Sequence, residues 1–442
     1  MSAEDAAAWR FETTQIHAGA APDPTTGARA TPIYKTTSYV FENADHARDL
    51  FALARPGNIY SRIMNPTNDV VEQRVAALEG GTAALLVASG QAAETYAVLN
   101  IASAGDHIVA SSSIYGGTYN LFKYTLAKLG IETTFVEDQD DADEWRRAIR
   151  PNTKLFFGET IGNPRVNVLD IEKVSSIAHE AGVPLIVDNT IATPYLIRPF
   201  EHGADIVVHS ATKFLGGHGT VVAGVIVDGG RFRWSDYPER FTELNTPDPS
   251  YNGVVFTQAV GDPIAYIIKA RVQLLRDLGA SVSPDTAFTL LQGIETLSLR
   301  IERHVQNAQA IAEWLDGHPD VATVAYAGLP SSPWFGAASK YAPRGVGAVL
   351  SFELKGGVDA GRALVDNLSL FSHLANIGDV RSLVIHPAST THSQLTPEQQ
   401  LTSGVTPGLV RLSVGLENVE DLKADLERGL EAARATAAAQ RA

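Results

Sequence analysis

The sequence of 442 residues contains no cysteine. This absence excludes disulfide bonds, thiolate zinc sites, iron–sulfur ligation and a cysteine nucleophile, so serine, lysine and bound cofactors remain for covalent chemistry. Long apolar runs are missing too, and none approaches the ~18 residues that a membrane-spanning helix needs. The first nine residues carry Glu4 and Asp5 and lack the basic start and apolar stretch of an export signal. We therefore expect a soluble, cytoplasmic protein without a membrane partner.

Positive charge is also scarce. Lys and Arg number 35 against 50 Asp and Glu, which gives a formal net charge of 35 − 50 = −15. A surface of this sign repels phosphate backbones, so nucleic acid is not an expected partner. An anionic ligand must instead be held by a local arrangement of Lys, Arg and backbone N–H groups. Because a single core usually stops growing near ~250 to 300 residues, the length predicts two domains.

The first 290 residues divide into an arm and a large domain. Prolines and glycines recur along residues 1–68, so we expect this segment to form an arm without helices that lies on another surface. A helix is expected from Asn68 to Glu79. Beyond it, short β-rich runs alternate with helical stretches, which predicts an α/β domain over residues 69–290 with a mainly parallel sheet covered by helices on both faces. The expected strands are residues 85–88, 107–110, 133–136, 155–158, 185–188, 206–209 and 221–227.

Two further segments complete the expected organisation. A helical pattern over residues 286–312 predicts one long helix that links the large domain to a smaller C-terminal α/β domain, residues 291–442. Residues 229–261 are irregular and rich in proline and aromatic residues. A loop of this length is either functional or interfacial, or it is a packed surface excursion, and the sequence leaves both interpretations open.

Polar residues follow several expected strands at their carboxyl ends, where ligands bind in sheets of this class. The turn Ser89-Gly90-Gln91 precedes a helix and could present backbone N–H groups to a phosphate, although many strand-to-helix turns have this composition. Tyr115 follows the next strand and offers a ring on which a planar cofactor could stack. Asn163 adds a neutral polar group at the same edge.

Asp188 and Lys213 are the most informative pair. Asp188 ends an apolar strand, where a carboxylate is costly to bury without a cationic partner such as a protonated pyridine nitrogen. The alternative is that Asp188 only caps the segment that follows. The separation of 213 − 188 = 25 residues accommodates one strand, one helix and one strand, so both side chains should reach the same edge. Lysine can condense with an aldehyde there and, once released, act as a base. Ser210 and Thr212 place hydroxyl groups beside it.

These residues belong to an ordered series of motifs that resembles the Cys/Met-metabolism family of pyridoxal-phosphate enzymes. The resemblance spans nearly the whole chain, and it implies an aspartate-aminotransferase-like fold of type I and a pyridoxal 5'-phosphate cofactor. The motifs are Tyr60-Ser61-Arg62, Ser89-Gly90, Tyr115-Gly116-Gly117-Thr118, residues 159–164, Asp188-Asn189-Thr190, Ser210-Ala211-Thr212-Lys213, His386-Pro387-Ala388-Ser389 and residues 411–417.

The resemblance implies a role for each matched residue. Lys213 would be the Schiff-base lysine and proton shuttle, Asp188 the partner of the pyridine nitrogen, and Tyr115 the stacked ring that also assists proton movement. Asn163 would neighbour the cofactor's phenolic oxygen, and Arg411 would bind the α-carboxylate of the substrate. The phosphate would be lined by Ser89, Gly90, Gln91, Ser210 and Thr212. Tyr60 and Arg62 would come from the adjacent subunit, which makes a dimer obligatory, and the family usually forms homotetramers built from two such dimers.

Within the family, the residues look like those of the O-acetylhomoserine sulfhydrylases, in which sulfide replaces acetate to give homocysteine for methionine biosynthesis. Relatives that make or split cystathionine commonly carry a glutamate where this chain has Ala375, followed here by Asn376, which we expect to line the substrate site with Asn163 and Tyr60. Alanine cannot pair with the amino group of a second amino acid, so a small nucleophile is favoured.

Other activities stay open at this point. Cystathionine γ-synthase is one, and a methionine or cystathionine γ-lyase is another, although methionine γ-lyases generally use a cysteine near the site. The acetyl, succinyl or phospho leaving group is not decided by the sequence. A cofactor-binding relative without turnover and a nicotinamide-dependent oxidoreductase are weaker alternatives, because Lys213 is present and no G-x-G-x-x-G turn occurs. No metal is expected, since His209, His218, His386 and His392 lack metal-site spacing and are interpreted as structural.

Overall fold

The computed structural model describes residues 9–391, 393, 394, 396–402 and 404–439. Its main body is a seven-stranded sheet in the order β1-β7-β6-β5-β4-β2-β3. The neighbouring pairs from β6 to β3 are parallel, whereas β7 is antiparallel to both β1 and β6. The expected α/β class is confirmed, with one reversed strand. The strands are β1 (Ala83–Val87), β2 (His107–Ser111), β3 (Glu132–Val136), β4 (Thr153–Glu159), β5 (Leu185–Asp188), β6 (Ile206–Ser210) and β7 (Gly224–Asp228).

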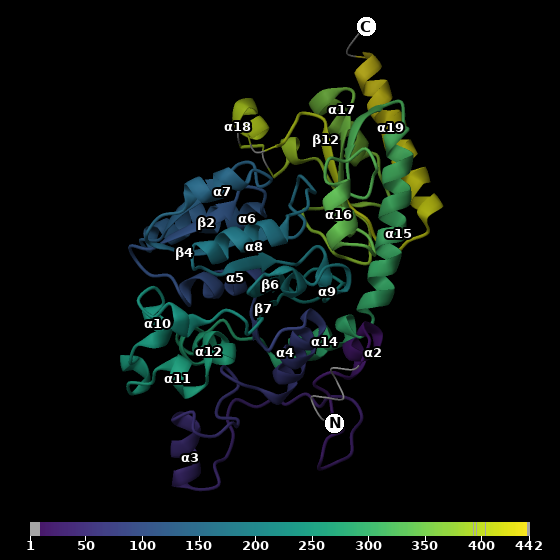
Figure 1. Ribbon diagram of the computed structural model, residues 1–442. Coiled ribbons are helices and arrows are strands. Elements are labelled where there is room, and N and C mark those ends of the chain that lie inside the picture. Colours follow the sequence, from purple (N-terminus) through teal and green to yellow (C-terminus); the bar gives the residue numbers. More distant parts are fainter. Residues whose placement is uncertain (1–8, 392, 395, 403, 440–442) are drawn as a thin grey trace.

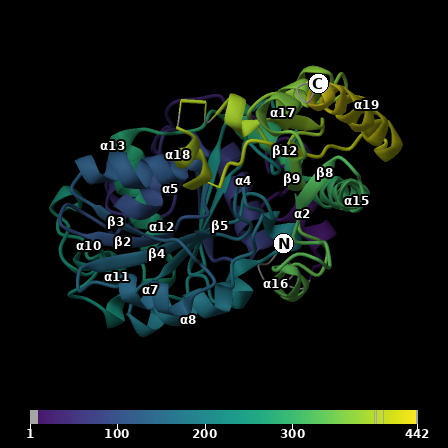
Figure 2. The ribbon, with the colours of Figure 1, turned by 90° about the horizontal axis from the view of Figure 1, so that it is seen from above.

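Helices cover both faces of this sheet because its strands are apolar on both sides. In β5, Leu185 and Val187 belong to one core cluster and Ile186 to the other, as the period of two in a strand requires. The first cluster is completed by α4 (Pro66–Glu79), α7 (Ala142–Ala148) and α8 (Ile171–Glu180), and the second by α5 (Gly90–Leu99) and α12 (Asp262–Lys269). The sandwich is visible in Figures 1 and 2.

A second, smaller sheet follows in the C-terminal part of the chain. It has five strands in the order β10-β11-β12-β9-β8. Helices α15 (Leu297–Asp316), α17 (Gly357–Asp366) and α19 (Val419–Ala439) lie beside it at the upper right of Figure 1. The domain boundaries expected at residues 68 and 290 fall inside helices and stay predictions. The strands are β8 (Val321–Ala325), β9 (Val349–Leu354), β10 (Ser372–His373), β11 (Leu383–Ile385) and β12 (Leu409–Ser413).

Two expectations about helices were wrong. The arm is not free of helix, because α2 (Phe11–His17) and α3 (Ala44–Phe51) are short enough to fit between its prolines. Helix α2 is held by tertiary contacts, with Gln15 donating to the Ser298 hydroxyl at 3.0 Å. The single long helix expected over residues 286–312 is two helices, α14 (Pro284–Ile294) and α15. Arg300 donates to the Gly293 carbonyl at 2.7 Å and so satisfies a backbone acceptor where α14 ends.

The irregular segment 229–261 is a packed excursion. It contains the short helices α10 (Thr242–Asn245) and α11 (Phe256–Ala259), which lie with α12 at the lower left of Figure 1. Trp234 stacks on Tyr266 with ring centroids 5.3 Å apart and an interplanar angle of 9°, and Phe241 is fully buried. Phe232, Trp234, Phe241 and Phe256 therefore form part of the second core cluster.

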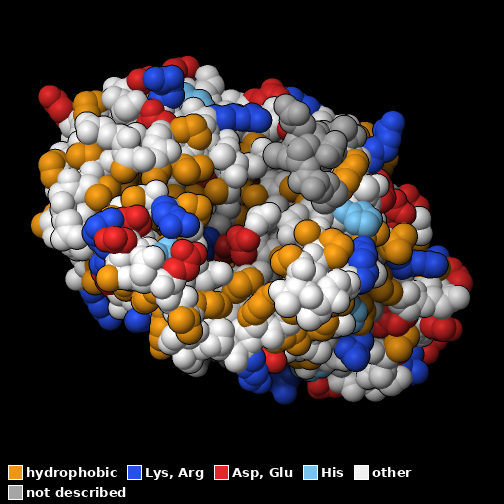
Figure 3. All heavy atoms as spheres, turned by 90° about the horizontal axis from the view of Figure 1, so that it is seen from below, with side chains coloured by type: hydrophobic (Ala, Val, Ile, Leu, Met, Phe, Trp, Pro, Cys, Tyr) orange, Lys and Arg blue, Asp and Glu red, His pale blue; other side chains and the backbone are white. Residues whose placement is uncertain are grey.

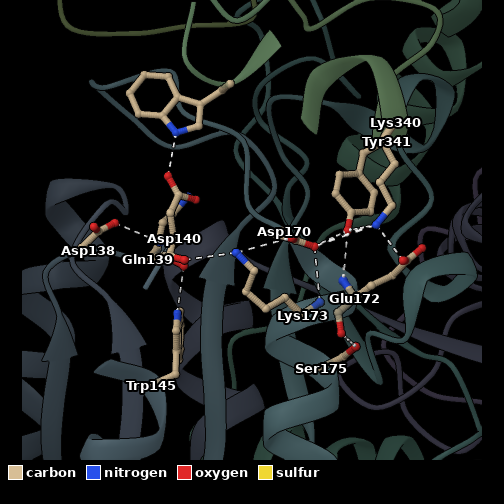
Figure 4. Close-up of polar contacts among 11 residues, drawn as sticks. Asp138, Gln139, Asp140, Trp145, Asp170, Glu172, Lys173, Ser175, Lys340 and Tyr341 are labelled. Carbon is tan, nitrogen blue, oxygen red and sulfur yellow. Dashed lines mark hydrogen bonds and ion pairs between the residues drawn. The ribbon is translucent and has the colours of Figure 1, made fainter. Parts of the chain in front are cut away.

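A polar contact that we call the clasp joins helix α8 to α16 (Phe335–Tyr341), which lies between β8 and β9 in the chain. Lys340 donates to the Glu172 carboxylate at 2.6 Å, and the Tyr341 hydroxyl donates to Asp170 (Figure 4). Lys173 donates to the Asp140 carbonyl at 3.0 Å.

Among the described residues, no helix combines the length and the apolar character that crossing a bilayer requires.

Candidate active site

Asp188 and Lys213 lie at the same edge of the main sheet. Asp188 is the last residue of β5 and is in register with Val208 of β6, while Lys213 follows the end of β6 by three residues. Thr190 links the two strand ends, because its amide donates to Asp188 Oδ1 and its hydroxyl accepts from the Ser210 amide, each at 2.8 Å. The structure thus brings the carboxylate and the amine to one edge, as the 25-residue spacing indicated.

The Lys213 amine is partly buried and donates to Asn376 Oδ1. Burial lowers the pKa of Lys213, and the positive charge of Arg411 lowers it further. Both effects favour the uncharged amine, which is the form that attacks a carbonyl or accepts a proton. Asn376 comes from the loop between β10 and β11, so the small sheet contributes directly to the surroundings of this lysine.

Gly378 allows that loop to approach the lysine turn. It has a φ of +79°, and a Cβ atom there would lie 2.7 Å from the Phe214 amide nitrogen and 3.0 Å from Lys213 Cα. The first distance is too short for a real Cβ atom, the second is very tight, and a positive φ is itself strained for a residue with a side chain. The Gly378 amide donates to the Ser413 hydroxyl at 3.0 Å, which fixes the loop against β12.

Arg411 lies on β12 and points toward residues from both sheets. Its guanidinium donates to Asn163 Oδ1 at 3.1 Å and to the Asn376 carbonyl at 3.3 Å. Burial lowers the pKa of Arg411, but guanidinium stays protonated at any ordinary pH. A partly buried, oriented guanidinium is suited to bidentate binding of a carboxylate.

Tyr115 precedes helix α6 (Gly116–Asn120) at the end of β2. Its amide donates to Glu159 Oε1 at 2.5 Å, which fixes the backbone, and its side chain is 51 % exposed. A Cβ atom on Gly117 would lie 2.4 Å from the ring, so glycine at this position leaves the space that the ring occupies. The ring can therefore present one face to a planar molecule at the strand ends.

The Ser89-Gly90-Gln91 turn starts helix α5 beside Ser210. The Ser89 hydroxyl accepts from the Ala92 amide at 3.0 Å, and a Cβ atom on Gly90 would lie 2.7 Å from Ser210 Cβ. The helix start therefore fits against β6 only with glycine, and it lies against the Ser210 side chain. The Thr212 hydroxyl instead donates to the Ala223 carbonyl at 3.2 Å and accepts from the Ala223 amide at 3.0 Å. Backbone N–H groups and hydroxyls at the start of a ten-residue helix suit a phosphate. The Gln91 side chain, in contrast, turns away to Glu94 at 2.8 Å.

Two buried carboxyl groups beside Asp188 were missed by the sequence reasoning. Glu159 ends β4 in register with Asp188, and Glu94 lies one helical turn after Gly90 on α5. Burial raises the pKa of Asp188, and burial together with the negative charge of Asp188 raises the pKa of Glu94 and Glu159 well above the usual range. The rule that singled out Asp188, a carboxylate at the end of an apolar strand, also applies to Glu159.

Tyr60 and Arg62 do not join the other site residues within their own chain. Tyr60 is bridged to Ser38 in the arm, and Arg62 donates to the Arg276 carbonyl at 3.0 Å. Their described contacts include none with Lys213 or Asp188. The arm extends away from the body at the bottom of Figure 1, with the small sheet at the opposite end.

The histidines singled out in the sequence have protein partners. Buried His209 contacts Glu79 Oε1 at 2.5 Å, and His386 contacts the Ser389 hydroxyl and the Pro407 carbonyl, each at 2.8 Å. His218 contacts the Gly216 carbonyl at 2.8 Å. His392 lies outside the described residues, as do residues 1–8 with Glu4 and Asp5.

Residues 12–431 match the model of a family described as Cys/Met metabolism PLP-dependent enzymes. The O-acetyl-L-homoserine sulfhydrylase of Leptospira meyeri is 56 % identical over 427 residues, which cover 95 % of this chain and 96 % of the relative. A second enzyme of that name, from Thermus thermophilus, is 54 % identical over 95 % of this chain and 100 % of its own length. The homocysteine/cysteine synthase of Saccharomyces cerevisiae is 50 % identical over 95 % of this chain and 97 % of its own.

A solved structure gives the same result for the fold. It is described as an O-acetylhomoserine (thiol)-lyase from Campylobacter jejuni that contains a pyridoxyl-lysine monophosphate. The two folds agree with a TM-score of 0.92 at 44 % sequence identity, over 96 % of this chain and 100 % of the other. The fold-type-I architecture expected from the sequence is therefore confirmed.

Proposed function

Since the chain belongs to the Cys/Met-metabolism family of PLP-dependent enzymes, we propose that it converts O-acetyl-L-homoserine and sulfide to L-homocysteine and acetate in methionine biosynthesis. The observation that carries this proposal is the convergence of Lys213, Asp188 and Arg411 from two sheets on one edge, in a chain similar over its full length to enzymes of that activity. Sulfide is a small nucleophile, and this is consistent with Ala375, which offers no carboxylate to the amino group of a second amino acid.

The residues present fit a pyridoxal 5'-phosphate. Lys213 would hold its aldehyde carbon, Asp188 its ring nitrogen, and the start of α5 with Ser89, Ser210 and Thr212 its phosphate. The fit is supported by the buried Asp188, which forms no ion pair with Lys or Arg among the described residues, and by the glycine that the Gly90 contact demands. When bound, the cofactor withdraws electrons from the α-carbon of the amino acid.

The chain's own residues would then bind the substrate and move its protons. Arg411 would hold the α-carboxylate, and its contact with Asn163 keeps the guanidinium oriented toward the main sheet. Lys213 would remove the proton from the α-carbon, for which its lowered pKa is suited. Loss of a second proton from the β-carbon would allow acetate to leave; hydrosulfide would then add at the γ-carbon, and the two protons would return to the β- and α-carbons to give L-homocysteine. Asn376 would keep the Lys213 amine in place between these transfers.

The test supplies purified protein with sulfide and O-acetyl-, O-succinyl- or O-phosphohomoserine in turn, and measures homocysteine and 2-oxobutyrate. We expect homocysteine from the acetyl ester, in an amount equal to the sulfide consumed. Cysteine in place of sulfide is the control for a cystathionine-forming enzyme. Dominant 2-oxobutyrate without consumption of sulfide would contradict the proposal and indicate a γ-lyase.

We also propose that Tyr60 and Arg62 complete the site of a neighbouring subunit in a cytoplasmic homotetramer built from two dimers. The arm supports this because its apolar residues Ile33, Val40 and Phe51 are 42 %, 98 % and 56 % exposed. Apolar side chains are also spread over the face at the arm end of the molecule in Figure 3. Apolar surface of this kind is typical of an interaction site.

Mixed oligomers test the arm's role. Chains with Lys213→Ala and chains with Arg62→Ala are each expected to be inactive, but a mixed dimer regains one site that has both residues. The matched control mixes Lys213→Ala with Arg411→Ala, two residues of the same chain's site, and should regain nothing. No recovery in the first mixture, with the dimers shown to exchange, would contradict the shared site.

A further inference from the structure

Arg300 is a buried arginine on helix α15 that is compensated by uncharged oxygen atoms. Its side chain is 5 % exposed, and it forms no ion pair among the described residues. Burial lowers its pKa to about 10, which still leaves the guanidinium protonated at neutral pH. A buried cation without an opposite charge is costly unless hydrogen bonds satisfy its donors. The acceptors around Arg300 therefore show what this cation does for the fold.

The Arg300 guanidinium binds the backbone directly after Lys213. Its Nη1 atom donates to the Phe214 carbonyl at 2.8 Å, and its Nη2 atom donates to the Leu215 carbonyl at 3.3 Å and to the Gly293 carbonyl at 2.7 Å. Among the described residues, the Phe214 and Leu215 carbonyls receive no other hydrogen-bond donor. One planar group thus joins the lysine turn, residues 213–217, to the end of α14.

Two glycines make room for this contact. Gly217 has a φ of +74°, and a Cβ atom there would lie 2.1 Å from Arg300 Nη1, so a side chain at this position would displace the guanidinium from the turn. A Cβ atom on Gly293 would lie 2.4 Å from the Gly216 carbonyl oxygen. The Gly217 amide also donates to the Lys213 carbonyl at 2.7 Å. The lysine turn, the end of α14 and Arg300 are therefore packed closely against one another.

The next turn of α15 contacts the strand that carries Arg411. His304, four residues after Arg300 and on the same face of the helix, donates from Nδ1 to the Val414 carbonyl at 2.6 Å, and Val414 directly follows β12. The His304 ring also meets the Phe214 ring edge-on, with centroids 5.4 Å apart. Figure 1 shows α15 extending from α14 to the small sheet. One face of α15 thus holds the lysine turn and the end of β12.

We propose that Arg300 is a positioning residue that holds the lysine turn against α15 and so sets where the Lys213 amine lies relative to Asp188 and Arg411. This inference rests on the proposed function, in which the amine must reach both the cofactor aldehyde and the α-carbon of a substrate held by Arg411. Apart from the Thr296 hydroxyl, the described acceptors of Arg300 are backbone carbonyls. Arg300 therefore acts through the turn and not on the substrate.

The test compares two ligands on cofactor-stripped protein by calorimetric titration. Pyridoxal phosphate can condense with the Lys213 amine, whereas pyridoxine phosphate carries an alcohol in place of the aldehyde and cannot. Arg300→Met removes the guanidinium but keeps a long, unbranched side chain. We expect it to raise the Kd for pyridoxal phosphate roughly 10- to 100-fold, as the loss of hydrogen bonds from a charged group implies. The Kd for pyridoxine phosphate should stay within about twofold, because Asp188 and the start of α5 receive no contact from Arg300.

Arg74→Met is the matched control. Arg74 is 1 % exposed and donates to the Ala18 carbonyl at 3.0 Å, so it is also a buried guanidinium bound to the backbone, but it lies on α4 and its described contacts include none with the lysine turn. Both variants should lower the Tm, but Arg74→Met should leave the ratio of the two Kd values unchanged.

Two other outcomes separate this inference from the proposed function. If Arg300→Met raises both Kd values by the same factor, or raises neither, Arg300 only supports the fold and the inference fails. If the wild type stays colourless and binds pyridoxal phosphate no more tightly than pyridoxine phosphate, Lys213 does not hold the aldehyde and the proposed function fails instead.

Arg300→Lys keeps the inference testable if Arg300→Met does not fold. Lysine retains the charge but lacks the planar fork that reaches Phe214, Leu215 and Gly293 together. The Kd for pyridoxal phosphate alone should rise, by roughly 3- to 10-fold, since part of the hydrogen bonding remains. In steady state, kcat should fall about 10-fold with the KM for O-acetylhomoserine unchanged, because the amine is misplaced while Arg411 is not. Unchanged Kd values, or a rise in KM without a fall in kcat, would overturn the inference.

Discussion

The carboxyl groups at the end of β5 and those of the clasp differ in their exposure to solvent and in their ion pairing. In the clasp, Glu172 and Lys340 are about half exposed, at 50 % and 47 %, and they pair directly with each other (Figure 4). Glu172 and Tyr341 raise the pKa of Lys340. At the strand end, Asp188 is buried and forms no ion pair with Lys or Arg among the described residues.

The exposed charges of the clasp connect two parts of the chain, whereas the buried carboxyl groups at the end of β5 are suited to binding a cationic ligand. An exposed pair contributes little, because water already solvates both groups and the pairing restricts two long side chains. A buried carboxylate without a cation is costly, and a fold retains it only when something else compensates it. We propose that the cation of a bound cofactor ring provides this compensation for Asp188.

Substitution of Lys213 should have the largest effect. Lys213→Ala removes the amine that we propose holds the cofactor and moves protons, so turnover to homocysteine should fall at least ~1,000-fold. The yellow colour that the wild type retains after dialysis should be lost. Unchanged colour and turnover would show that the strand-end charges serve no cofactor.

Arg411→Lys keeps the positive charge but removes the planar pair of donors. We expect kcat/KM for O-acetylhomoserine to fall roughly 100-fold, because a lysine cannot bind the carboxylate in bidentate fashion. The KM for sulfide should stay the same, since sulfide has no carboxylate, and serves as the internal control. Equal losses for both substrates would indicate that Arg411 supports the fold and not the substrate.

Substitution of Asp228 tests whether a buried carboxyl group without an ion-pair partner must belong to a ligand-binding site. It ends β7 at the opposite edge of the sheet, and burial raises its pKa to about 8. An acid whose folded pKa is raised stabilises the fold at low pH and loses this contribution between its unfolded value of 3.8 and the folded value. The Tm of Asp228→Asn relative to the wild type should therefore increase from about pH 4 to about pH 8, with cofactor binding unchanged. A constant difference across that range would show that Asp228 is ionised in the fold.

Lys340→Ala should have the smallest effect. It removes the ammonium group of the clasp, and the Tm should change by no more than ~2 °C, because the pair is exposed. Steady-state kinetics should match the wild type, in contrast with Arg411→Lys, which also alters a single cation. A large fall in kcat/KM would mean that the clasp controls the distance between the two sheets.

Some of the site could be predicted because its members follow strands. Asp188, Lys213, Tyr115 and Asn163 each come after an apolar run, and the carboxyl ends of parallel strands meet at one edge. Glu94 could not be found in this way, since it faces Asp188 only through the packing of α5 on the sheet. Asn376 was chosen for its position in a motif, but its contact with the lysine amine depends on the approach that Gly378 permits.

The order of apolar runs along the chain was enough to determine the α/β class, the strand positions and the edge where the chemistry lies, because hydrophobic periodicity and chain direction are local properties. The break between α14 and α15, the short helices of the arm and the burial of the 229–261 segment were decided by tertiary contacts, as were the raised pKa of Glu94 and the lowered pKa of Lys213. Helix ends and pKa values depend on groups that are distant in sequence, and only the folded arrangement brings those groups within hydrogen-bonding distance.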